Sequence, residues 1–191
     1  AHLCLGILWS RNQCHATFGT IGSMLKNIAP VIDSDRLLAS LYTEWGIWHA
    51  KERQDQSAEE KFRSVIDYNP TQIPARTELG RLLSRQPGRE KEAEDFLLEA
   101  IRINPKDLQS RTELGRLLSR QPGREKEAED FLLEAIRIDP KSLHTRTVLA
   151  KLYERTDRIP KAIDLYHELC EIDPGNRYGL DGLARLEGKS V

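Results

Sequence analysis

One stretch of 28 residues occurs twice in the chain, letter for letter. The string RTELGRLLSRQPGREKEAEDFLLEAIRI occupies residues 76–103 and again residues 111–138, so the two copies begin 35 residues apart. A fixed period of this size is typical of proteins built from stacked structural repeats, in which each unit buries its apolar face against its neighbours. The duplication therefore constrains the fold more than any other feature of the sequence.

Each copy has the pattern of two helices joined by a tight turn. In the first copy, apolar residues recur at helical spacing in two stripes, and Pro87-Gly88 between them is a turn signal. Asn104-Pro105 ends the second stripe, because proline cannot continue the helix that it follows. The two stripes are Leu79, Leu82 and Leu83, and then Ala93, Leu97, Ala100 and Ile101.

The spacing of these residues resembles the tetratricopeptide repeat (TPR), a helix–turn–helix unit of about 34 residues. The first copy matches the family pattern at Leu79-Gly80, Leu83, Ala93, Leu97, Ala100 and Pro105. The second copy matches it at Leu114-Gly115, Leu118, Ala128, Leu132, Ala135 and Pro140. Flanking units match at Trp45-Gly46, Ala58, Phe62 and Pro70, and at Leu149-Ala150, Tyr153, Ala162, Tyr166 and Pro174.

The resemblance implies an all-α fold, a right-handed α-solenoid of stacked helix–turn–helix units whose first helices form a concave surface. We expect a degenerate N-terminal TPR-like unit and linker at 1–38 and a C-terminal capping helix at 177–191. Between them we expect four units, at 39–72, 73–107, 108–142 and 143–176. The two middle units have 35 residues, and the residue added to the family's length falls in the turn between their helices.

The composition suits a protein with an ordered core and limits its class. The chain has 191 residues and a net charge of −1, with 39% apolar and 31% charged residues. Cys4, Cys14 and Cys170 are odd in number and have no framework spacing, so we expect no disulfide scaffold and a reducing, cytoplasmic location. No apolar stretch reaches the roughly 20 residues that a membrane-spanning helix needs. The chain begins at Ala1 rather than at Met, and we expect it to be a fragment of a longer protein.

The sequence carries no motif for catalysis, cofactor binding or metal binding. Phosphate-loop, dinucleotide-binding and nucleophile-elbow motifs are missing, and the five histidines are scattered among different units. Cys14-His15 could gather Cys4 and His2, but this group lacks the spacing of a structural zinc site. We therefore expect no enzyme activity, no cofactor and no metal in this chain.

Basic residues recur on the first helices at positions that face the groove in the proteins this chain resembles. In three successive units two of them are four residues apart, so they share one helix face. Stacking the units would align these pairs into a ladder of positive charge, which Arg185 would extend. The candidate partner-binding residues are Thr77, Arg81, Arg85, Thr112, Arg116, Arg120, His144, Thr147, Lys151 and Arg155.

Two interpretations of this ladder stay open. Arginine forks suit carboxylates and phosphates, so the groove would bind an acidic protein or peptide segment, as expected of a noncatalytic scaffold. Alternatively, acidic neighbours such as Glu78 and Glu113 balance the cations locally, and the face is solvated. Other functional hypotheses are RNA or other nucleic-acid binding, and a sensor or regulatory array of a larger signalling ATPase or other enzyme. Repeats that lack polar caps would also associate through the ends of the solenoid.

Overall fold

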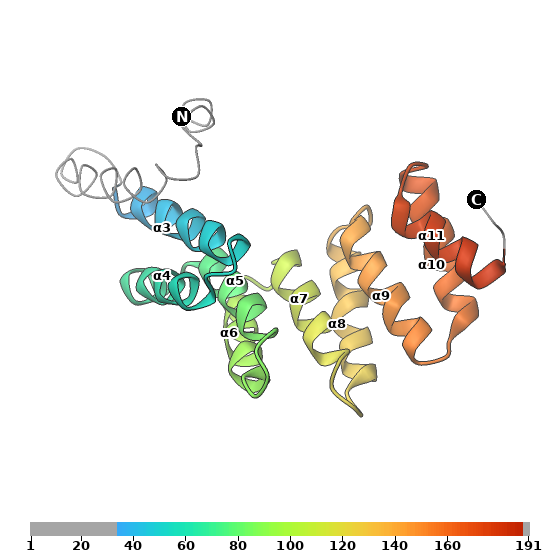
Figure 1. Ribbon diagram of the computed structural model, residues 1–191, viewed down its shortest axis with the longest axis horizontal. Coiled ribbons are helices and arrows are strands. Elements are labelled where there is room, and N and C mark those ends of the chain that lie inside the picture. The colour runs from blue at the N-terminus through green and yellow to red at the C-terminus, as the bar shows by residue number, and fades with distance from the viewer. Residues whose placement is uncertain (1–33, 189–191) are drawn as a thin grey trace. The chain divides into compact units, whose positions relative to one another are not determined.

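The computed structural model of the chain describes residues 34–188, and this part of the chain is helical. Nine helices joined by short turns follow one another there, with no strand among the described residues (Figure 1). The predicted all-α helical-repeat fold class is confirmed. The helices are α3 (Ser34–Lys51), α4 (Asp55–Tyr68), α5 (Ile73–Leu83), α6 (Glu90–Ile103), α7 (Leu108–Leu118), α8 (Glu125–Ile138), α9 (Leu143–Arg155), α10 (Ile159–Ile172) and α11 (Arg177–Glu187).

The two copies of the duplicated string adopt the same local structure. Helices α6 and α8 share the sequence EKEAEDFLLEAIRI, and each is followed by a residue with extended backbone, Asn104 or Asp139. Each helix buries one face made of two alanines and one leucine, because these residues recur at helical spacing. The buried residues are Ala93, Leu97 and Ala100 in α6, and Ala128, Leu132 and Ala135 in α8.

A glycine forms the turn between the helices of each copy. Gly88 and Gly123 both have a φ angle of 83°, in the left-handed region that residues with a side chain rarely adopt. The backbone N–H of each glycine donates to the carboxylate two residues later, Glu90 or Glu125, at 3.2 Å in both copies. The Pro-Gly signal in the sequence therefore corresponds to one defined turn, formed twice.

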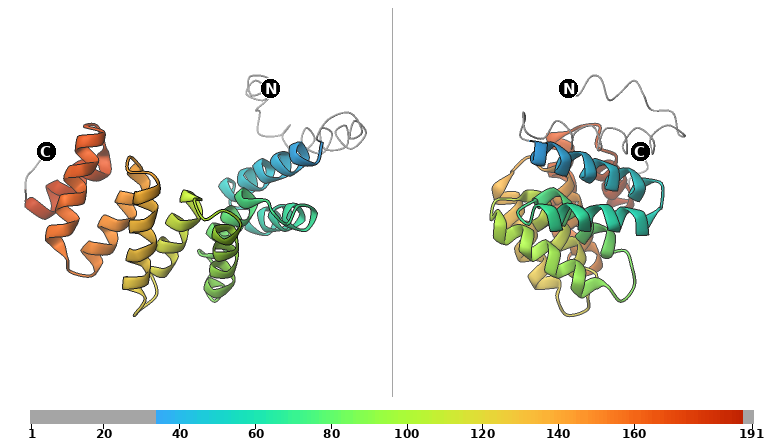
Figure 2. Two further views of the ribbon diagram at one scale, coloured as in Figure 1. Left: turned by 180° about the vertical axis from the view of Figure 1, so that it is seen from behind. Right: turned by 90° about the vertical axis from the view of Figure 1, so that its left-hand side faces the viewer.

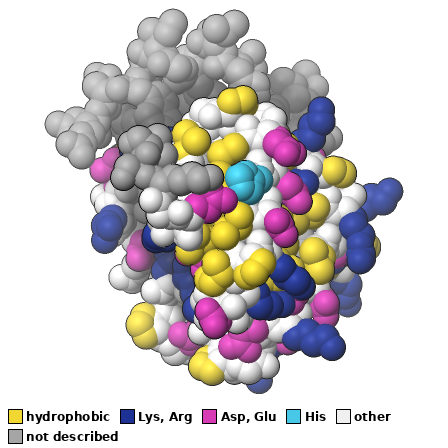
Figure 3. Space-filling view, turned by 90° about the vertical axis from the view of Figure 1, so that its right-hand side faces the viewer, with side chains coloured by type: hydrophobic (Ala, Val, Ile, Leu, Met, Phe, Trp, Pro, Cys, Tyr) yellow, Lys and Arg dark blue, Asp and Glu magenta, His cyan; other side chains and the backbone are white. Residues whose placement is uncertain are grey.

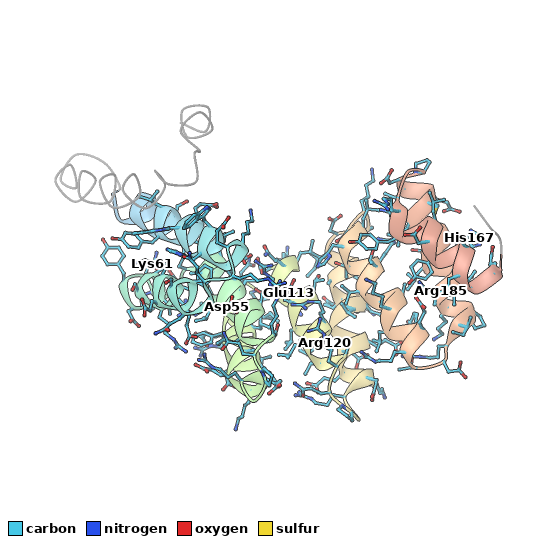
Figure 4. All side chains as sticks on the ribbon, viewed as in Figure 1. Asp55, Lys61, Glu113, Arg120, His167 and Arg185 are labelled. Carbon is cyan, nitrogen blue, oxygen red and sulfur yellow. The ribbon has the colours of Figure 1, made fainter. Side chains whose placement is uncertain are left out.

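The chain divides into two compact units, and each is described by itself. Unit 1 comprises residues 1–82, in which α3 and α4 pack together and bury Trp45 and Phe62. Lys61, labelled in Figure 4, places its ammonium 4.3 Å from the centre of the Trp45 ring.

Most of the predicted N-terminal unit at 1–38 lies outside the described residues. The same is true of the grouping predicted not to bind metal, His2, Cys4, Cys14 and His15.

Unit 2 comprises residues 83–191, and its helices stack in chain order. From α6 to α11 each helix packs on the next, as Figures 1 and 2 show. Helix α7 also contacts α9, the first helix of the following repeat. Thr112 of α7 and Thr145 of α9 are buried there and share a hydroxyl–hydroxyl hydrogen bond of 2.9 Å. The first helices of successive repeats are therefore direct neighbours, which is the arrangement that a groove requires.

Ion pairs between repeats recur at equivalent positions of the second helices. Arg124, just before α8, donates to both carboxylate oxygens of Glu94 in α6, at 2.6 and 2.8 Å. Arg158, just before α10, pairs with Glu129 of α8. Glu94 and Glu129 occupy the same position in the two copies, so the duplication repeats an inter-repeat contact as well as a core.

The end of unit 2 formed by α10 and α11 exposes apolar side chains among charged ones (Figure 3). Ile172 and Tyr178 are 39% and 60% exposed, which is high for large apolar residues. Helix α11 itself is well capped, because the Asn176 side chain accepts a hydrogen bond of 3.0 Å from the N–H of Gly179. Association of the chain through such an end stays a prediction.

Candidate functional site

A pocket of about 430 Å³ lies in unit 2, along α7, α9 and the start of α11. Its apolar lining comes from α9, with the half-buried Leu143 and the buried Val148 and Leu152. Its polar lining is basic, and none of the described residues that line it is acidic. The polar and aromatic residues of the lining are Arg116, Ser119, Arg120, His144, Thr147, Lys151, Arg155, Asn176 and Tyr178.

Six of the candidate residues predicted from the sequence line this one pocket. They come from two successive repeats, and they are Arg116, Arg120, His144, Thr147, Lys151 and Arg155. Thr112 does not line it, because its side chain is buried and its hydroxyl donates to the carbonyl of Leu108 in its own helix, at 2.9 Å. Arg85 belongs to unit 2 but does not line the pocket, whereas Thr77 and Arg81 belong to unit 1. Thr77 is also buried, and its hydroxyl donates to the carbonyl of Ile73 at 3.1 Å.

Acidic residues balance some of the predicted cations inside their own helices. Arg116 donates from Nε to Glu113 Oε2 at 2.8 Å, and Arg81 donates to Glu78 in the equivalent pair of the other copy at 2.9 Å. Glu113, labelled in Figure 4, is almost fully buried behind this pair. The interpretation that acidic neighbours balance the cations of the ladder therefore applies to Arg81 and Arg116.

Three other cations of the pocket are not balanced in this way. In the part of the chain whose side chains the structure describes, Arg120, Lys151 and Arg155 form no ion pair within 4.0 Å. Lys151 lies over the ring of Tyr178, with its ammonium 5.0 Å from the ring centre. The pocket therefore combines three cations that form no ion pair with a described residue and an apolar strip from α9.

The cations are close enough to repel one another. Burial lowers the pKa of Arg120, and the neighbouring guanidinium of Arg116 lowers it further. Arg85 and Arg155 act in the same direction, whereas Glu113 opposes them. Arg120, labelled in Figure 4, thus lies within electrostatic range of three other arginines and of one carboxylate.

The sequence did not predict that α11 contributes to the pocket, and it predicted a groove position for Arg185 that the structure does not show. Tyr178 and Asn176 line the pocket, but they lie in or beside the segment predicted to be a cap rather than a groove helix. Arg185, predicted to extend the ladder, instead donates to both carboxylate oxygens of Glu154, at 2.8 and 2.7 Å. This correction follows from an acidic residue on the neighbouring α9, a pairing that the spacing within one repeat does not reveal.

Glu113 couples the pocket to the core of unit 2. Burial alone would raise the pKa of this carboxyl, but His144 and Arg116 outweigh burial and hold the pKa below its usual value. The Nε2 atom of His144 lies 3.7 Å from Glu113 Oε1. Because the folded pKa is lowered, the charged Glu113 stabilises the fold above the unfolded-state pKa, and this contribution is lost as the pH falls through the folded pKa.

Glu113→Gln is expected to lower the free energy of unfolding by about 1–3 kcal/mol near pH 6, because Arg116 loses its charged partner while half-buried. As the pH falls below about 4.5, the wild-type chain should lose stability faster than the variant, since only the wild type must protonate this carboxylate. Urea denaturation across this pH range measures both effects. Parallel stability profiles for the two proteins would show that Glu113 does not contribute to the pH dependence.

The described residues offer neither a metal site nor a membrane-spanning helix. Among residues 34–188, no group of three or more His, Cys, Asp or Glu side chains is placed to hold a metal ion. None of the described helices is both long enough and apolar enough to cross a membrane.

Stacked helix–turn–helix units with a groove along their first helices define a helical-repeat protein of the tetratricopeptide-repeat fold. Solved structures that share this fold include the following three. YrrB, a TPR protein with an unusual peptide-binding site, is 18% identical, with a TM-score of 0.63 over 87% of this chain and 84% of that chain. TTC0263, a thermophilic TPR protein of Thermus thermophilus, is 20% identical, with a TM-score of 0.65 over 92% and 93% of the two chains.

The third is the APC/C hetero-tetramer Cut9–Hcn1, 20% identical with a TM-score of 0.66, covering 78% of this chain and 30% of that chain. No protein-family model and no curated protein sequence matches the chain. The structural likenesses confirm the tetratricopeptide-repeat fold that the sequence predicted.

Proposed function

We propose that this chain is a noncatalytic protein-interaction scaffold, and that the pocket along α7, α9 and α11 binds an acidic segment of a partner protein. The observation that carries the proposal is a set of three cations, Arg120, Lys151 and Arg155, that form no ion pair with a described residue and line a pocket without an acidic residue in its described lining. Carboxylates on a bound segment would supply the missing counter-charges. An apolar side chain of the same segment would fit against Leu143 and Val148.

A second pocket in unit 2 does not offer the same selectivity. It lies between α6 and the end of α7, with a volume of about 770 Å³. Its lining carries both signs of charge, with Lys91 and Arg124 beside Glu94 and Asp95. Arg124 and Glu94 are moreover already paired with each other. Charge complementarity therefore favours the pocket along α7, α9 and α11.

The structural neighbours support the same class of function. YrrB is described as having a peptide-binding site, and Cut9 forms a hetero-tetramer with Hcn1. At 18% and 20% identity these likenesses carry over the fold, and the proposal for this chain stands on its own pocket. A role as the regulatory array of a larger enzyme is compatible with such a pocket, because the array would then bind its partner in the same way.

RNA binding is the alternative that the same positive charge raises. Proteins that bind single strands without sequence preference combine a basic groove with aromatic side chains on which bases stack. The one aromatic residue in the described lining of the pocket, apart from His144, is Tyr178, and Lys151 already lies over its ring. The apolar strip and the shortage of stacking surfaces favour a peptide.

A binding titration tests the proposal. A fluorescent peptide rich in Glu and Leu is titrated with the wild-type chain and with the triple variant Arg120→Gln, Lys151→Gln and Arg155→Gln. We expect the variant to bind about 10- to 100-fold more weakly, since each uncompensated charge contributes about 0.5–1 kcal/mol. The affinity of the wild type should also fall as salt is added.

A matched control separates the pocket from net charge. The variant Arg102→Gln, Lys126→Gln and Arg137→Gln removes three cations from the second helices α6 and α8, outside the pocket. It should bind the peptide as the wild type does. Equal loss in both variants would refute a specific pocket, and binding of an RNA oligonucleotide in preference to the peptide would favour the alternative function.

A further inference from the structure

The uncompensated charge in the pocket is not spread evenly along it. Arg120 follows the end of α7 and Arg155 ends α9, so the two arginines occupy equivalent positions of successive repeats. Both line the pocket, and neither forms an ion pair with any residue in the described range 39–188. Lys151 differs from them, since it is engaged with the ring of Tyr178.

The surroundings of Arg120 concentrate positive potential at one point. Arg116, Arg85 and Arg155 all act on Arg120 electrostatically and disfavour its charge, whereas Glu113 favours it. The fold therefore places Arg120 within electrostatic range of three other guanidinium groups and of one carboxylate, Glu113, which Arg116 already binds. Like charges held together destabilise the empty site, and a ligand with more than one negative charge would relieve that repulsion best.

The forked geometry of the arginine side chains also favours a phosphate over a carboxylate. A carboxylate carries one negative charge and satisfies one arginine fork, whereas a phosphate monoester carries close to two charges and three acceptor oxygens. Two arginines from different repeats can each donate a fork to one phosphate. Clusters of arginine are a recurrent means of recognising phosphorylated segments.

We propose that the Arg120–Arg155 end of the pocket receives a phosphorylated side chain of the partner segment. The inference rests on the proposed function, because it assigns one group of the bound segment to one end of the same pocket. Leu143 and Val148 lie further along the pocket lining on α9 and would hold an apolar residue of that segment. Lys151 and Tyr178 would contact its remaining acidic residues.

Three forms of one peptide test this inference by fluorescence anisotropy on the full chain. The peptide, rich in Glu and Leu, carries serine, glutamate or phosphoserine at one central position. With the wild type we expect phosphoserine to bind about tenfold more tightly than serine and several-fold more tightly than glutamate. Arg120→Gln and Arg155→Gln should each remove most of the gain that phosphoserine gives over glutamate.

A conservative variant shows whether the guanidinium fork or the charge alone is recognised. Arg120→Lys keeps the charge but loses the fork, so it should bind the glutamate peptide as the wild type does and lose part of the phosphoserine gain. Arg137→Gln, on the exposed face of α8, is the control and should change nothing.

The possible failures are distinguishable. If the serine and glutamate peptides bind but phosphoserine adds nothing over glutamate, the pocket binds acidic segments and the phosphate inference is wrong. A phosphoserine gain that survives in both Arg120→Gln and Arg155→Gln would place the phosphate elsewhere and would also overturn the inference. If no peptide of the three binds, the proposed function fails first and the inference with it.

Discussion

Leu132→Ala is expected to lower the free energy of unfolding by about 2–5 kcal/mol, as deletion of a fully buried leucine does when the core cannot collapse. Leu132 is fully buried on α8, facing α7. Urea denaturation followed by circular dichroism measures the loss. Leu133→Ala, at a half-buried neighbour on the same helix, should cost less than half as much. Equal losses at the two positions would contradict this assignment of the core.

Leu132 packs against Gly115 of α7, so changes at the two positions should not be additive. A Cβ atom at Gly115 would lie 2.6 Å from Leu132 Cγ, so Gly115→Ala forces the Leu132 side chain or the helices to shift. The clash costs about 1–3 kcal/mol, offset by about 1 kcal/mol of better helix propensity. In the Leu132→Ala background the added methyl group fills part of the cavity. The double variant should therefore be about 1–2 kcal/mol more stable than the sum of the single changes predicts.

Tyr166→Ala is the second large effect, with an expected loss of about 3–5 kcal/mol. Tyr166 is fully buried on α10 and donates its hydroxyl hydrogen bond to Glu154 of α9. Its ring lies against Gly182 of α11, where a Cβ atom would be 2.6 Å from the ring carbons. One side chain thus joins three helices, and its removal should loosen α11 as well as lower the overall stability. Hydrogen exchange of the α11 amides checks the local effect.

Tyr166→Phe separates the ring from the hydroxyl. It removes one hydrogen bond to Glu154, and we expect a loss of about 1 kcal/mol because Arg185 still binds that carboxylate. If Tyr166→Phe were as damaging as Tyr166→Ala, the hydrogen bond rather than the packed ring would hold the end of unit 2.

The duplicated string explains how far the fold could be predicted from the sequence. Leucine and alanine at helical spacing, a Pro-Gly turn and a terminal Asn-Pro or Asp-Pro are local signals, and each has the same meaning in both copies. Leu132 is buried where the pattern places it, and Gly123 adopts the left-handed turn that its type allows. Repetition helps because every unit repeats the same signals and stacks on its neighbour in the same way.

The charge state of the groove could not be predicted in the same way. The spacing of Arg116 and Arg120 predicted that both lie on one face of a helix, but α7 ends at Leu118 and Arg120 lies in the turn beyond it. Arg116 is paired with Glu113, whereas Arg120 forms no ion pair with a described residue. The difference depends on side-chain direction, since the residue three positions after Glu113 reaches its carboxylate. Thr112 likewise turns toward its own helix backbone, a local competition that helical threonines commonly show.

Ion pairs between repeats also could not be predicted from the sequence of a single repeat. Arg185 is bound by Glu154 of a preceding helix, and Arg124 by Glu94. The Arg124–Glu94 pair could be predicted by comparing the repeats with one another. An arginine precedes both α8 and α10, and an acidic residue recurs at positions 94 and 129. No repeated pattern predicts the position of Tyr178, because α11 reaches the pocket only as a result of its packing on α10.

Photo-crosslinking tests most directly whether an acidic segment binds along α7, α9 and α11. A photoreactive phenylalanine analogue replaces Tyr178, which is exposed and lines the pocket, and in a second protein it replaces Tyr68, which is similarly exposed in unit 1. With the Glu- and Leu-rich peptide, crosslinks should form from position 178, disappear in the Arg120→Gln, Lys151→Gln and Arg155→Gln background, and not form from position 68. Crosslinks from position 68 alone, or from position 178 regardless of the three cations, would contradict the proposed site.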